Sequence, residues 1–410
     1  MRFFIFCLLL LLFDLTVFQV VQLSMQDFPE PVYLIIAVVF WIIPVALILW
    51  QILSVQTNKK YIFPGKHRMI RSSFQLVYFG KFIVLVLFFI GFLLSIVYTG
   101  FSYFFPGLFF NYEFPPLLAR IAVLISGLLV VMLIYGIIRN RHRYQLHKVD
   151  IRIKNLPSAL DGLKIIHISD IHSGSFTAKE PIMKGIQLIN AQKPDLVFFT
   201  GDLVNSTAIE IEPYVDVFNK ISSKYGVFSI FGNHDYGDYV RWPSQAAKAA
   251  NLERLKNTQK QLGWQLLLNE NRLLTIKGEQ IAIIGVENYS ASPRFSKYGN
   301  LAKAIKGTAS IPLKLLLSHD PSHWDHEVNR YFKEIDITFS GHTHGAQFGL
   351  EIPGFFRWSP IKYVYRQWAG LYQKGEQYIY VNRGFGYLGY PGRVGILPEI
   401  ALIKIIGKNN

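Results

Sequence analysis

Four long apolar runs in the first 140 residues constrain the fold of this chain more than any other feature. Each run has roughly 18 or more mostly apolar residues, the length that a helix needs to cross a bilayer. We place these segments at residues 3–23, 32–53, 76–98 and 117–138. The mean hydropathy of the whole chain, +0.27, is also high for a water-soluble protein. The sequence therefore predicts a multi-span α-helical membrane region over residues 1–148.

The first apolar segment is the most polar of the four, because it contains Asp14, Gln19 and Gln22. A short basic start at Arg2 before a leucine run also fits a cleaved secretion signal. We find no small-x-small cleavage pattern after it, so we favour a retained helix and keep the signal as the alternative. Asp14 either acts inside the membrane or faces a polar partner within the helix bundle, and we favour the second interpretation.

Basic residues in the connections indicate the orientation in the membrane. The connection between the second and third segments carries Lys59, Lys60, Lys66, Arg68, Arg71 and Lys81 and no acid. The other two connections carry Asp27, Glu30 and Glu113 and no Lys or Arg. The fourth segment is followed by Arg139, Arg141, Arg143 and Lys148. Since Lys and Arg accumulate in loops on the cytoplasmic side, we expect a multi-pass protein of the cell membrane with both termini in the cytoplasm.

The formal net charge of +15 divides between the two halves of the chain. Residues 1–149 hold 12 Lys and Arg against 4 Asp and Glu, so about half of the excess is this orientation signal. The charge is therefore weak evidence for nucleic-acid binding, and we expect no nucleic-acid partner. Cys7 is the only cysteine, which excludes an internal disulfide and suits a reducing compartment.

From about Val149 the sequence changes to short apolar runs separated by helical stretches, which is typical of an α/β or α+β domain. We expect buried strands at residues 163–169, 195–200, 227–231, 281–286, 313–318 and 336–340. Helical spacing occurs at residues 179–191, 245–262 and 323–333. We see no repeat or long linker. The sequence thus predicts one domain over residues 149–410, attached directly to the last membrane helix.

Side chains able to bind metals follow five of these strands. The stretches are SDIHSG with Asp170 and His172, TGDLVN with Asp202, FGNHDYG with Asn233 and His234, SHDP with His319, and FSGHTHG with His342 and His344. In open α/β sheets, ligands collect where the carboxyl ends of strands give way to loops. A lone histidine after a strand is more often a capping or solvent-facing residue. We assign such ordinary roles to His67, His142, His147, His167, His323 and His326.

Two Asp, one Asn and four of these five His make a joint pattern of seven possible ligands at five strand ends, which would rarely arise by chance. Carboxylate and amide oxygens mixed with imidazole nitrogens, without thiolate, suit Mn, Fe, Zn or a similar divalent ion. Seven ligands are too many for one tetrahedral ion and about right for two ions that share a carboxylate. Because two-metal sites activate water for in-line displacement at phosphorus, phosphoester hydrolysis is the leading chemistry.

These motifs resemble those of the calcineurin-like metallophosphoesterases. The matching elements are Asp170 and His172, Gly201 and Asp202, GNHD at residues 232–235, His319, and GHTH at residues 341–344. The resemblance covers about residues 160 to 405 and is specific because five separated motifs agree. It implies a four-layered fold in which two mixed β-sheets are sandwiched between helices, with a dinuclear metal centre in the loops at one end.

The resemblance also implies a role for each site residue. One metal ion is held by Asp170, His172 and His344, a second by Asn233, His319 and His342, and Asp202 bridges the two. The position of His234 is the one that contacts the scissile phosphate and helps the leaving oxygen depart, and Asn233 also faces the substrate. We expect Asp235 to orient the His234 ring as its hydrogen-bond partner.

The C-terminal tail from Asn382 is similar to that of one branch of the family, which includes membrane-associated bacterial enzymes and a transmembrane animal relative. In that branch an Arg before a Pro-Glu pair is common, and here Arg393 precedes Pro398 and Glu399. Arg393 could bind a substrate phosphate through its bidentate fork. The alternative is a surface arginine in a C-terminal turn.

The segment from Pro353 to Tyr372 interleaves aromatic and basic side chains. Aromatic rings settle at the headgroup level of membranes and basic side chains bind lipid phosphate, so the segment suits an anionic lipid interface. It could equally form a hydrophobic rim for a lipid-like substrate, or pack as an ordinary loop. Base stacking with a nucleic acid is the weakest interpretation.

The leading hypothesis is a membrane-anchored, metal-dependent hydrolase of phosphate esters or pyrophosphates at the cytoplasmic face. Since the enzyme is anchored, we expect a membrane substrate such as a phospholipid, a polyprenyl phosphate or a lipid-linked nucleotide. One alternative is a non-catalytic scaffold or sensor that keeps the fold, although none of the expected ligands is missing. A transporter with a regulatory domain is disfavoured, because the apolar segments contain few polar residues. The oligomeric state is not visible in the sequence.

Overall fold

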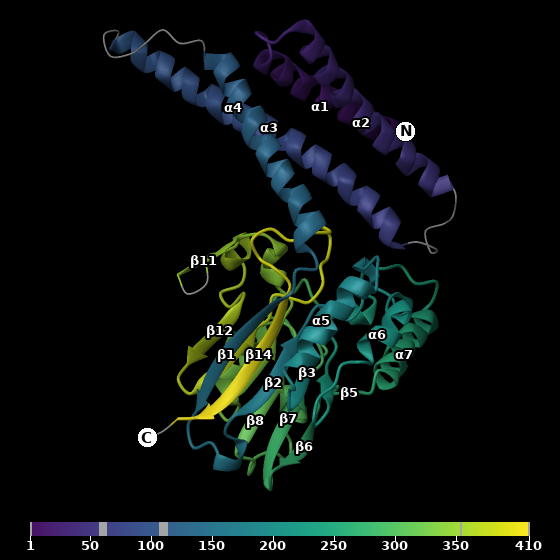
Figure 1. Ribbon diagram of the computed structural model, residues 1–410, viewed down its shortest axis with the longest axis vertical. Helices are drawn as coiled ribbons and strands as arrows, with labels where there is room; N and C mark the ends of the chain where they lie inside the picture. Colours follow the sequence, from purple (N-terminus) through teal and green to yellow (C-terminus); the bar gives the residue numbers. More distant parts are fainter. Residues whose placement is uncertain (1, 57–63, 106–113, 353–354, 409–410) are drawn as a thin grey trace. The chain divides into compact units, whose positions relative to one another are not determined.

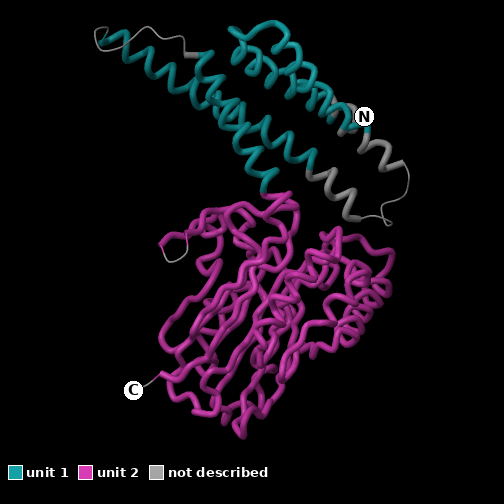
Figure 2. The backbone as a smooth tube through the Cα atoms, in the orientation of Figure 1, with its two compact units in different colours: residues 1–135 teal, residues 136–410 magenta. Residues whose placement is uncertain are grey.

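The computed structural model describes residues 2–56, 64–105, 114–352 and 355–408. The chain divides into two compact units, Met1–Tyr135 and Gly136–Asn410 (Figure 2). The division falls before the boundary expected at residues 148 and 149. The reason is that the segment after Tyr135 makes its contacts inside the second unit, where the Asn140 side chain donates a hydrogen bond to the Arg393 carbonyl at 3.1 Å.

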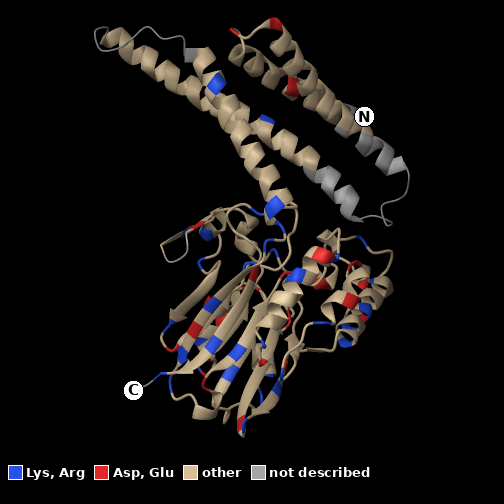
Figure 3. Ribbon diagram, viewed as in Figure 1, with Lys and Arg blue, Asp and Glu red and all other residues tan. Residues whose placement is uncertain are grey.

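The first unit is helical and contains few charged residues (Figure 3). Its helices are α1 (Arg2–Ser24), α2 (Glu30–Gln56), α3 (Pro64–Phe104) and α4 (Phe114–Tyr135). Each of the four apolar segments is therefore helical. Within the described residues, two stretches are long and apolar enough to cross a membrane, Ser73–Phe104 and Pro115–Asn140, whereas Leu8–Ser24 and Glu30–Ala46 are shorter. The expectation of four spans is thus not confirmed and stays a prediction.

A buried polar cluster joins α1 to α3 in the interior of this unit. The Lys81 ammonium lies 2.7 Å from Asp14 Oδ1, and the Tyr78 hydroxyl donates to Asp14 Oδ2 at 3.0 Å. The same ammonium lies 3.9 Å from the ring centroid of Phe40 on α2. Asp14 therefore faces a partner within the bundle, as we favoured. Lys81 is an interior helix residue and does not belong to the basic connection, while Lys59 and Lys60 lie outside the described residues.

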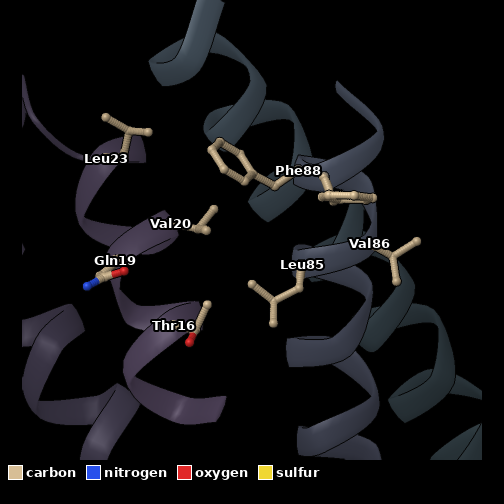
Figure 4. A pocket seen from close by; sticks show the side chains of 8 residues that line it. Thr16, Gln19, Val20, Leu23, Leu85, Val86 and Phe88 are labelled. Carbon is tan, nitrogen blue, oxygen red and sulfur yellow. The ribbon is translucent and has the colours of Figure 1, made fainter. Parts of the chain in front are cut away.

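An apolar groove of about 620 Å³ lies between α1 and α3 (Figure 4). Its walls include Val20 and Leu23 from α1 and Leu85 and Phe88 from α3. Thr16 and Gln19 are the polar side chains among its lining residues. The groove thus has a mainly apolar lining.

The second unit contains two six-stranded mixed sheets (Figure 1). The first has the order β1 (Gln145–Ile153), β14 (Glu399–Gly407), β2 (Leu163–Ile168), β3 (Leu196–Phe199), β4 (Val227–Ser229) and β5 (Trp264–Leu266). The second has the order β12 (Gly370–Lys374), β13 (Gln377–Val381), β9 (Ile337–Ser340), β8 (Leu313–Leu317), β7 (Glu279–Gly285) and β6 (Glu270–Ile276). All six strands expected from the sequence are present.

Side chains from both sheets form the central core. Ile165 and Phe198 from the first sheet pack in one buried cluster with Ile283, Leu315 and Phe339 from the second. Since strands alternate their side chains between faces, the opposite face of each sheet is left for helices. The two sheets therefore lie face to face, as the resemblance implied.

Helices cover the outer face of each sheet. The helix α5 (Glu180–Ala191) buries Ile182, Ile186 and Ile189, whose spacing places them on one face, in a cluster with first-sheet residues. The helices α6 (Val215–Phe218) and α7 (Gln245–Gln261) contribute to the same cluster. On the second sheet, α8 (Leu301–Ala304) and the turn before α9 (Asn329–Tyr331) pack through Ala304 and Trp324. The second unit therefore has the expected order helix, sheet, sheet, helix.

Parallel pairing places the loops of five strands at one end of this sandwich. Strands β2, β3 and β4 are parallel in the first sheet, and β8 and β9 are parallel in the second. The carboxyl ends of parallel strands meet at the same sheet edge, where ligands bind in such folds. These are the five strands that the polar motifs follow.

Candidate metal centre

The five loops bring seven candidate ligands together in two adjoining groups. The first group is Asp170, His172 and His344, and the second is Asp202, His319 and His342. In each group the potential ligand atoms lie within 4.8 Å of one another. The seventh candidate, Asn233, places its Oδ1 atom 3.1 Å from His319 Nε2 and 2.9 Å from His342 Nδ1.

Asp202 belongs to the second group and also approaches the first. Its Oδ2 atom is 3.2 Å from His319 Nε2 in the second group and 3.6 Å from His172 Nε2 in the first. Within the first group, His172 Nε2 lies 3.0 Å from His344 Nε2, which in turn is 3.2 Å from Asp170 Oδ1. The position of Asp202 suits a carboxylate shared by two ions.

The hydrogen bonds on the far side of His319 define its donor atom. Its Nδ1 atom lies 2.7 Å from the Thr200 carbonyl oxygen, so Nδ1 carries the hydrogen. A neutral His319 then directs the Nε2 lone pair at two acceptor oxygens, those of Asn233 and Asp202. Lone pairs that face each other repel unless a cation, a proton or a metal ion, lies between them. The site is built to hold positive charge.

His342 has the same arrangement. Its Nε2 atom lies 2.8 Å from the Tyr365 hydroxyl, which donates onward to Asp320 Oδ2 at 3.4 Å. Nε2 therefore carries the hydrogen, and the Nδ1 lone pair faces Asn233 Oδ1. Outer partners of this kind fix the tautomer and orientation of metal-binding histidines. The donor set of carboxylate, amide and imidazole groups fits divalent first-row ions.

Burial and charge set the protonation of these groups. Burial lowers the pKa of His172 well below its usual value, so this imidazole is neutral, the form that binds a metal. Burial would raise the pKa of Asp202, but His319 and His234 hold it well below its usual value, so the carboxylate is ionised. Burial would lower the pKa of His319, yet the Asp202 carboxylate raises it to about 10. A proton and a metal ion thus compete for the Nε2 atom of His319.

Five of the candidate ligands have backbones in the left-handed region. The φ angles are 53° for Asp170, 49° for His172, 62° for Asp202, 71° for His342 and 51° for His344. Residues other than glycine seldom adopt this conformation, and it clusters at functional sites. The strain follows from turning each ligand back across the end of its strand.

Two glycines allow the ligand loops to touch. A Cβ atom on Gly232 would lie 2.2 Å from Asp202 Oδ1, and one on Gly341 would lie 2.2 Å from Asp170 Oδ2. Both distances are far below van der Waals contact. The glycines in the GNHD and GHTH stretches are therefore required by the close approach of the loops.

Asp235 has a different position from the one that we expected. Its carboxylate accepts hydrogen bonds from the backbone amides of Gly232 and Asp202, both at 2.8 Å, and of Leu203 at 2.8 Å. The Nδ1 atom of His234 is instead 2.7 Å from the carbonyl oxygen of Asn205. Asp235 thus positions the loop that carries Asp202, and a main-chain carbonyl orients His234.

Arg393 is also placed differently from both expectations. Its side chain is completely buried, and its guanidinium donates to the carbonyl oxygens of Arg383, Gly384, Gly386 and His344. Since backbone carbonyls already occupy these donors, Arg393 is neither a substrate ligand nor a surface residue. It holds the C-terminal loops around the backbone of His344. Glu399 from the Pro-Glu pair binds Arg383, with 2.6 Å between Nη1 and Oε2.

A cavity of about 820 Å³ opens over both groups. His172, Asp202, His234, His342 and His344 line it on the metal-ligand side. Its other walls carry the basic side chains of Arg294, Arg330, Arg366 and His326, the largely apolar side chains of Phe295, Tyr365, Ile361 and Val364, and one carboxylate, that of Asp325. The cavity therefore suits an anionic ligand that also has apolar parts.

Some residues that contact the candidate ligands could not be predicted from the sequence. Tyr239 accepts a hydrogen bond from Asn233 Nδ2 at 2.7 Å, and its ring centroid lies 4.4 Å from that of His234. Tyr365 reaches His342 from the segment Pro353 to Tyr372, for which we expected lipid contact, a rim for a lipid-like substrate or ordinary loop packing. Asp320 is adjacent to His319 in sequence, which is the one signal that could have identified it.

Two of the six histidines with expected ordinary roles, His167 and His323, are buried and hydrogen-bonded away from the candidate ligands. His167 bonds Thr200 Oγ1 at 2.9 Å inside the sheet, and His323 bonds Ser318 and Glu327. His326 differs, because it lines the cavity and bonds the Tyr289 hydroxyl at 2.7 Å.

Comparison with known families agrees with this geometry. Residues 163–346 match the family model described as calcineurin-like phosphoesterase. This segment contains all seven candidate ligands. The second unit thus carries a calcineurin-like metallophosphoesterase domain with two His and Asp groups that could bind metal ions.

Relatives named as metallophosphoesterases cover the same part of the chain. The Bacillus subtilis protein named uncharacterized metallophosphoesterase YkuE is 29% identical over 281 residues, which is 67% of this chain and 91% of that protein. A zebrafish (Danio rerio) transmembrane protein with metallophosphoesterase domain is 27% identical over 70% of this chain. The match spans 63% of the zebrafish protein, less than two thirds of its length.

Among solved structures, the Haemophilus influenzae NAD nucleotidase aligns with 55% of this chain and 45% of its own. The sequence identity is 17% and the TM-score 0.37.

Proposed function

We propose that this protein is a membrane-anchored phosphohydrolase with two divalent metal ions, which cleaves phosphoester or pyrophosphate bonds at the cytoplasmic face. The observation that carries the proposal is the position of Asp202 between two His and Asp groups on the wall of one cavity. Asp170, His172 and His344 would hold one ion, Asn233, His319 and His342 the other, and Asp202 would bridge them.

Ions at these positions would supply a water molecule activated for attack and would neutralise charge on the phosphoryl oxygens. The protein supplies the proton for the leaving oxygen. His234 lines the cavity, and because its Nδ1 atom is bonded to the Asn205 carbonyl, Nε2 is the atom that can deliver a proton there. Tyr239, which lies against the His234 ring, limits the rotation of that imidazole.

The substrate that we propose is lipid-linked or close to the membrane. Two of the helices in the first unit are long and apolar enough to span a bilayer, and one of the similar proteins is named as a transmembrane protein. An enzyme anchored in this way meets membrane substrates at high local concentration. A second possibility, a non-catalytic scaffold with the same fold, predicts loss of ligand residues, whereas all seven candidates are present.

The test is metal-dependent turnover by the purified full-length protein. The protein is stripped of metal with a chelator, supplied with Mn²⁺, and assayed with an aryl phosphomonoester and an aryl phosphodiester. We expect hydrolysis only after metal is restored, and a His234→Ala rate lower by about 10²–10⁴-fold with unchanged metal content. If the wild-type rate does not exceed that of His234→Ala on either substrate, the protein is a scaffold.

A further inference from the structure

Exposed apolar side chains gather on a small hairpin and the turn after it. The hairpin consists of β10 (Leu350–Ile352) and β11 (Phe356–Trp358) and lies outside the two main sheets. We define the aromatic surface as six exposed residues: Leu350, Ile352, Phe355, Phe356, Tyr363 and Val364. The exposed fractions reach 85% for Phe355, 75% for Tyr363 and 73% for Val364. Exposed apolar groups concentrated in this way mark interaction sites.

This hairpin exposes its apolar face, whereas an ordinary amphipathic hairpin packs that face against the domain. Ile352 pairs directly with Phe356, and Glu351 with Arg357, so the two pairs lie on opposite faces. The polar pair bonds to the rest of the domain: Glu351 forms an ion pair with Arg383, and Arg357, although exposed, donates to the Ala369 carbonyl at 2.6 Å. The apolar face is left to the outside. Such an orientation is costly in water and favourable only against an apolar partner.

The charges around the aromatic surface indicate the kind of partner. In the described residues between 350 and 366, the one carboxylate is Glu351, and it is already paired with Arg383. Lys362 and Arg366 are exposed beside the aromatic surface, and Arg366 also lines the cavity. The partner should therefore combine an apolar layer with negative charge, which is the composition of an anionic membrane interface.

The aromatic surface is continuous with the candidate metal centre. Val364 belongs to the surface and lines the cavity, and the next residue, Tyr365, bonds His342. Arg294 and Arg330 lie on the same cavity. A phosphate group at the surface would thus enter a cavity whose outer walls carry three arginines, Arg294, Arg330 and Arg366, against one carboxylate, Asp325.

We propose that the aromatic surface docks on an anionic lipid bilayer, with Lys362 and Arg366 at the level of the headgroups, and that the cavity takes a phosphate ester carried on a lipid. The substrate class rests on the proposed function, whereas the docking does not. The aromatic rings lie at the interface and the arginines of the cavity bind the substrate phosphate.

The first experiment measures docking directly. A fluorophore sensitive to polarity is attached at Phe355→Cys in the full-length chain with Cys7→Ser, reconstituted in nanodiscs of phosphatidylcholine with or without phosphatidylglycerol. The matched control is Ile209→Cys, an exposed apolar position on another loop. We expect a blue shift and quenching by spin-labelled lipid at position 355 and not at 209, both stronger with phosphatidylglycerol. If quenching at position 355 is absent, or equals the quenching at position 209, the proposal is wrong. A blue shift without quenching also overturns the proposal, because protein, such as a second copy, then covers the surface.

The second experiment measures the consequence for the substrate. The variant Phe355→Ser/Tyr363→Ser is compared with Ile209→Ser on a long-chain alkyl phosphate in the nanodisc and on a soluble aryl phosphate. We expect the aromatic variant to lose about tenfold or more on the lipid substrate, equivalent to about 1.4 kcal/mol, with unchanged turnover of the soluble one. Equal losses on both substrates overturn the lipid assignment. If the wild type hydrolyses neither substrate, the proposed function fails, and the quenching experiment still decides the docking.

Discussion

At the scale of single residues, the carboxylate of Asp202 connects the two candidate metal groups. Its Oδ2 atom approaches a histidine of each group, and its Oδ1 atom accepts the backbone amide of His234 at 2.9 Å. One side chain therefore contacts both groups and the backbone of His234, the residue that we propose as proton donor. We therefore expect a change of this carboxylate to impair metal binding in both groups together with the activity.

The substitution Asp202→Asn tests this dependence. An amide has one oxygen and no charge, so it is a poor bridge between two ions. We expect bound metal, measured by mass spectrometry on the purified protein, to fall from two equivalents to about one or fewer, and phosphatase activity to be lost. A variant that retains two equivalents would refute the bridging role.

The hydroxyl of Tyr365 gives a second prediction at this scale. It accepts the Nε2–H group of His342 and links it to Asp320, so Tyr365→Phe removes the partner that orients a ligand. Loss of such a partner typically costs about 10–100-fold in metal affinity or activity. The matched control is Tyr363→Phe, which removes an exposed hydroxyl nearby. Equal metal affinity of the two variants, measured by competition with a chelating dye, would contradict the role.

At the scale of elements, Asp336 joins two neighbouring strands and is expected to make the domain sensitive to pH. It precedes β9, and its carboxylate accepts the backbone amide of Lys314 on β8 at 2.7 Å. Burial raises its pKa from 3.8 to about 6, more than this hydrogen bond lowers it. The folded protein therefore holds this proton more tightly than the unfolded chain, and stability falls as pH rises from about 4 to about 6.

Asp336→Asn should remove that loss of stability. The amide oxygen can still accept the Lys314 amide but does not ionise. We expect the variant to exceed the parent at pH 8 by up to about 3 kcal/mol, since each unit of pKa shift corresponds to about 1.4 kcal/mol, with little difference near pH 4. Thermal unfolding of both proteins at the two pH values measures this. If the variant is more stable than the parent by the same amount at pH 4 and pH 8, ionisation of Asp336 is not the cause of the gain in stability.

The pairing of α1 with α3 gives a prediction for the helical unit. Asp14 and Lys81 are both buried, so removal of one partner leaves an unpaired charge inside the bundle. We expect Lys81→Met alone to destabilise the protein by up to about 3–5 kcal/mol and the double variant Asp14→Asn/Lys81→Met to be less destabilised. Thermal unfolding of the full chain in detergent compares Lys81→Met, Asp14→Asn and the double variant. Destabilisation of the double variant by the sum of the single effects would mean that the two residues do not interact.

At the scale of the whole molecule, the basic residues after α4 predict the side of the membrane on which the second unit lies. Arg139, Arg141 and Arg143 follow the last apolar segment, and such residues stay in the cytoplasm. A fluorescent protein fused at the C-terminus should therefore fluoresce, and alkaline phosphatase fused there should be inactive. An active phosphatase fusion would place the second unit outside the cytoplasm.

Local patterns in the sequence determined the elements and the set of candidate ligands. Apolar runs predicted the helices of the first unit, because length and hydrophobicity are local properties. Short buried runs predicted the six strands, and the residues after five of them predicted the loops that meet at the candidate metal centre. Neighbouring parallel strands end at the same edge, so a local motif after each strand was sufficient to bring its ligand to that edge.

Only the tertiary structure decided which partner each side chain has. Asp235 binds the backbone of the Asp202 loop, Arg393 is buried among carbonyl oxygens, and Tyr365 reaches His342. The parallel pairing of β1 with β14 and the outward apolar face of the β10–β11 hairpin likewise have no local signature. Each of these features depends on how segments distant in sequence are packed. The order of the strands and the layers of the sandwich set that packing, and residue patterns within one segment do not specify it.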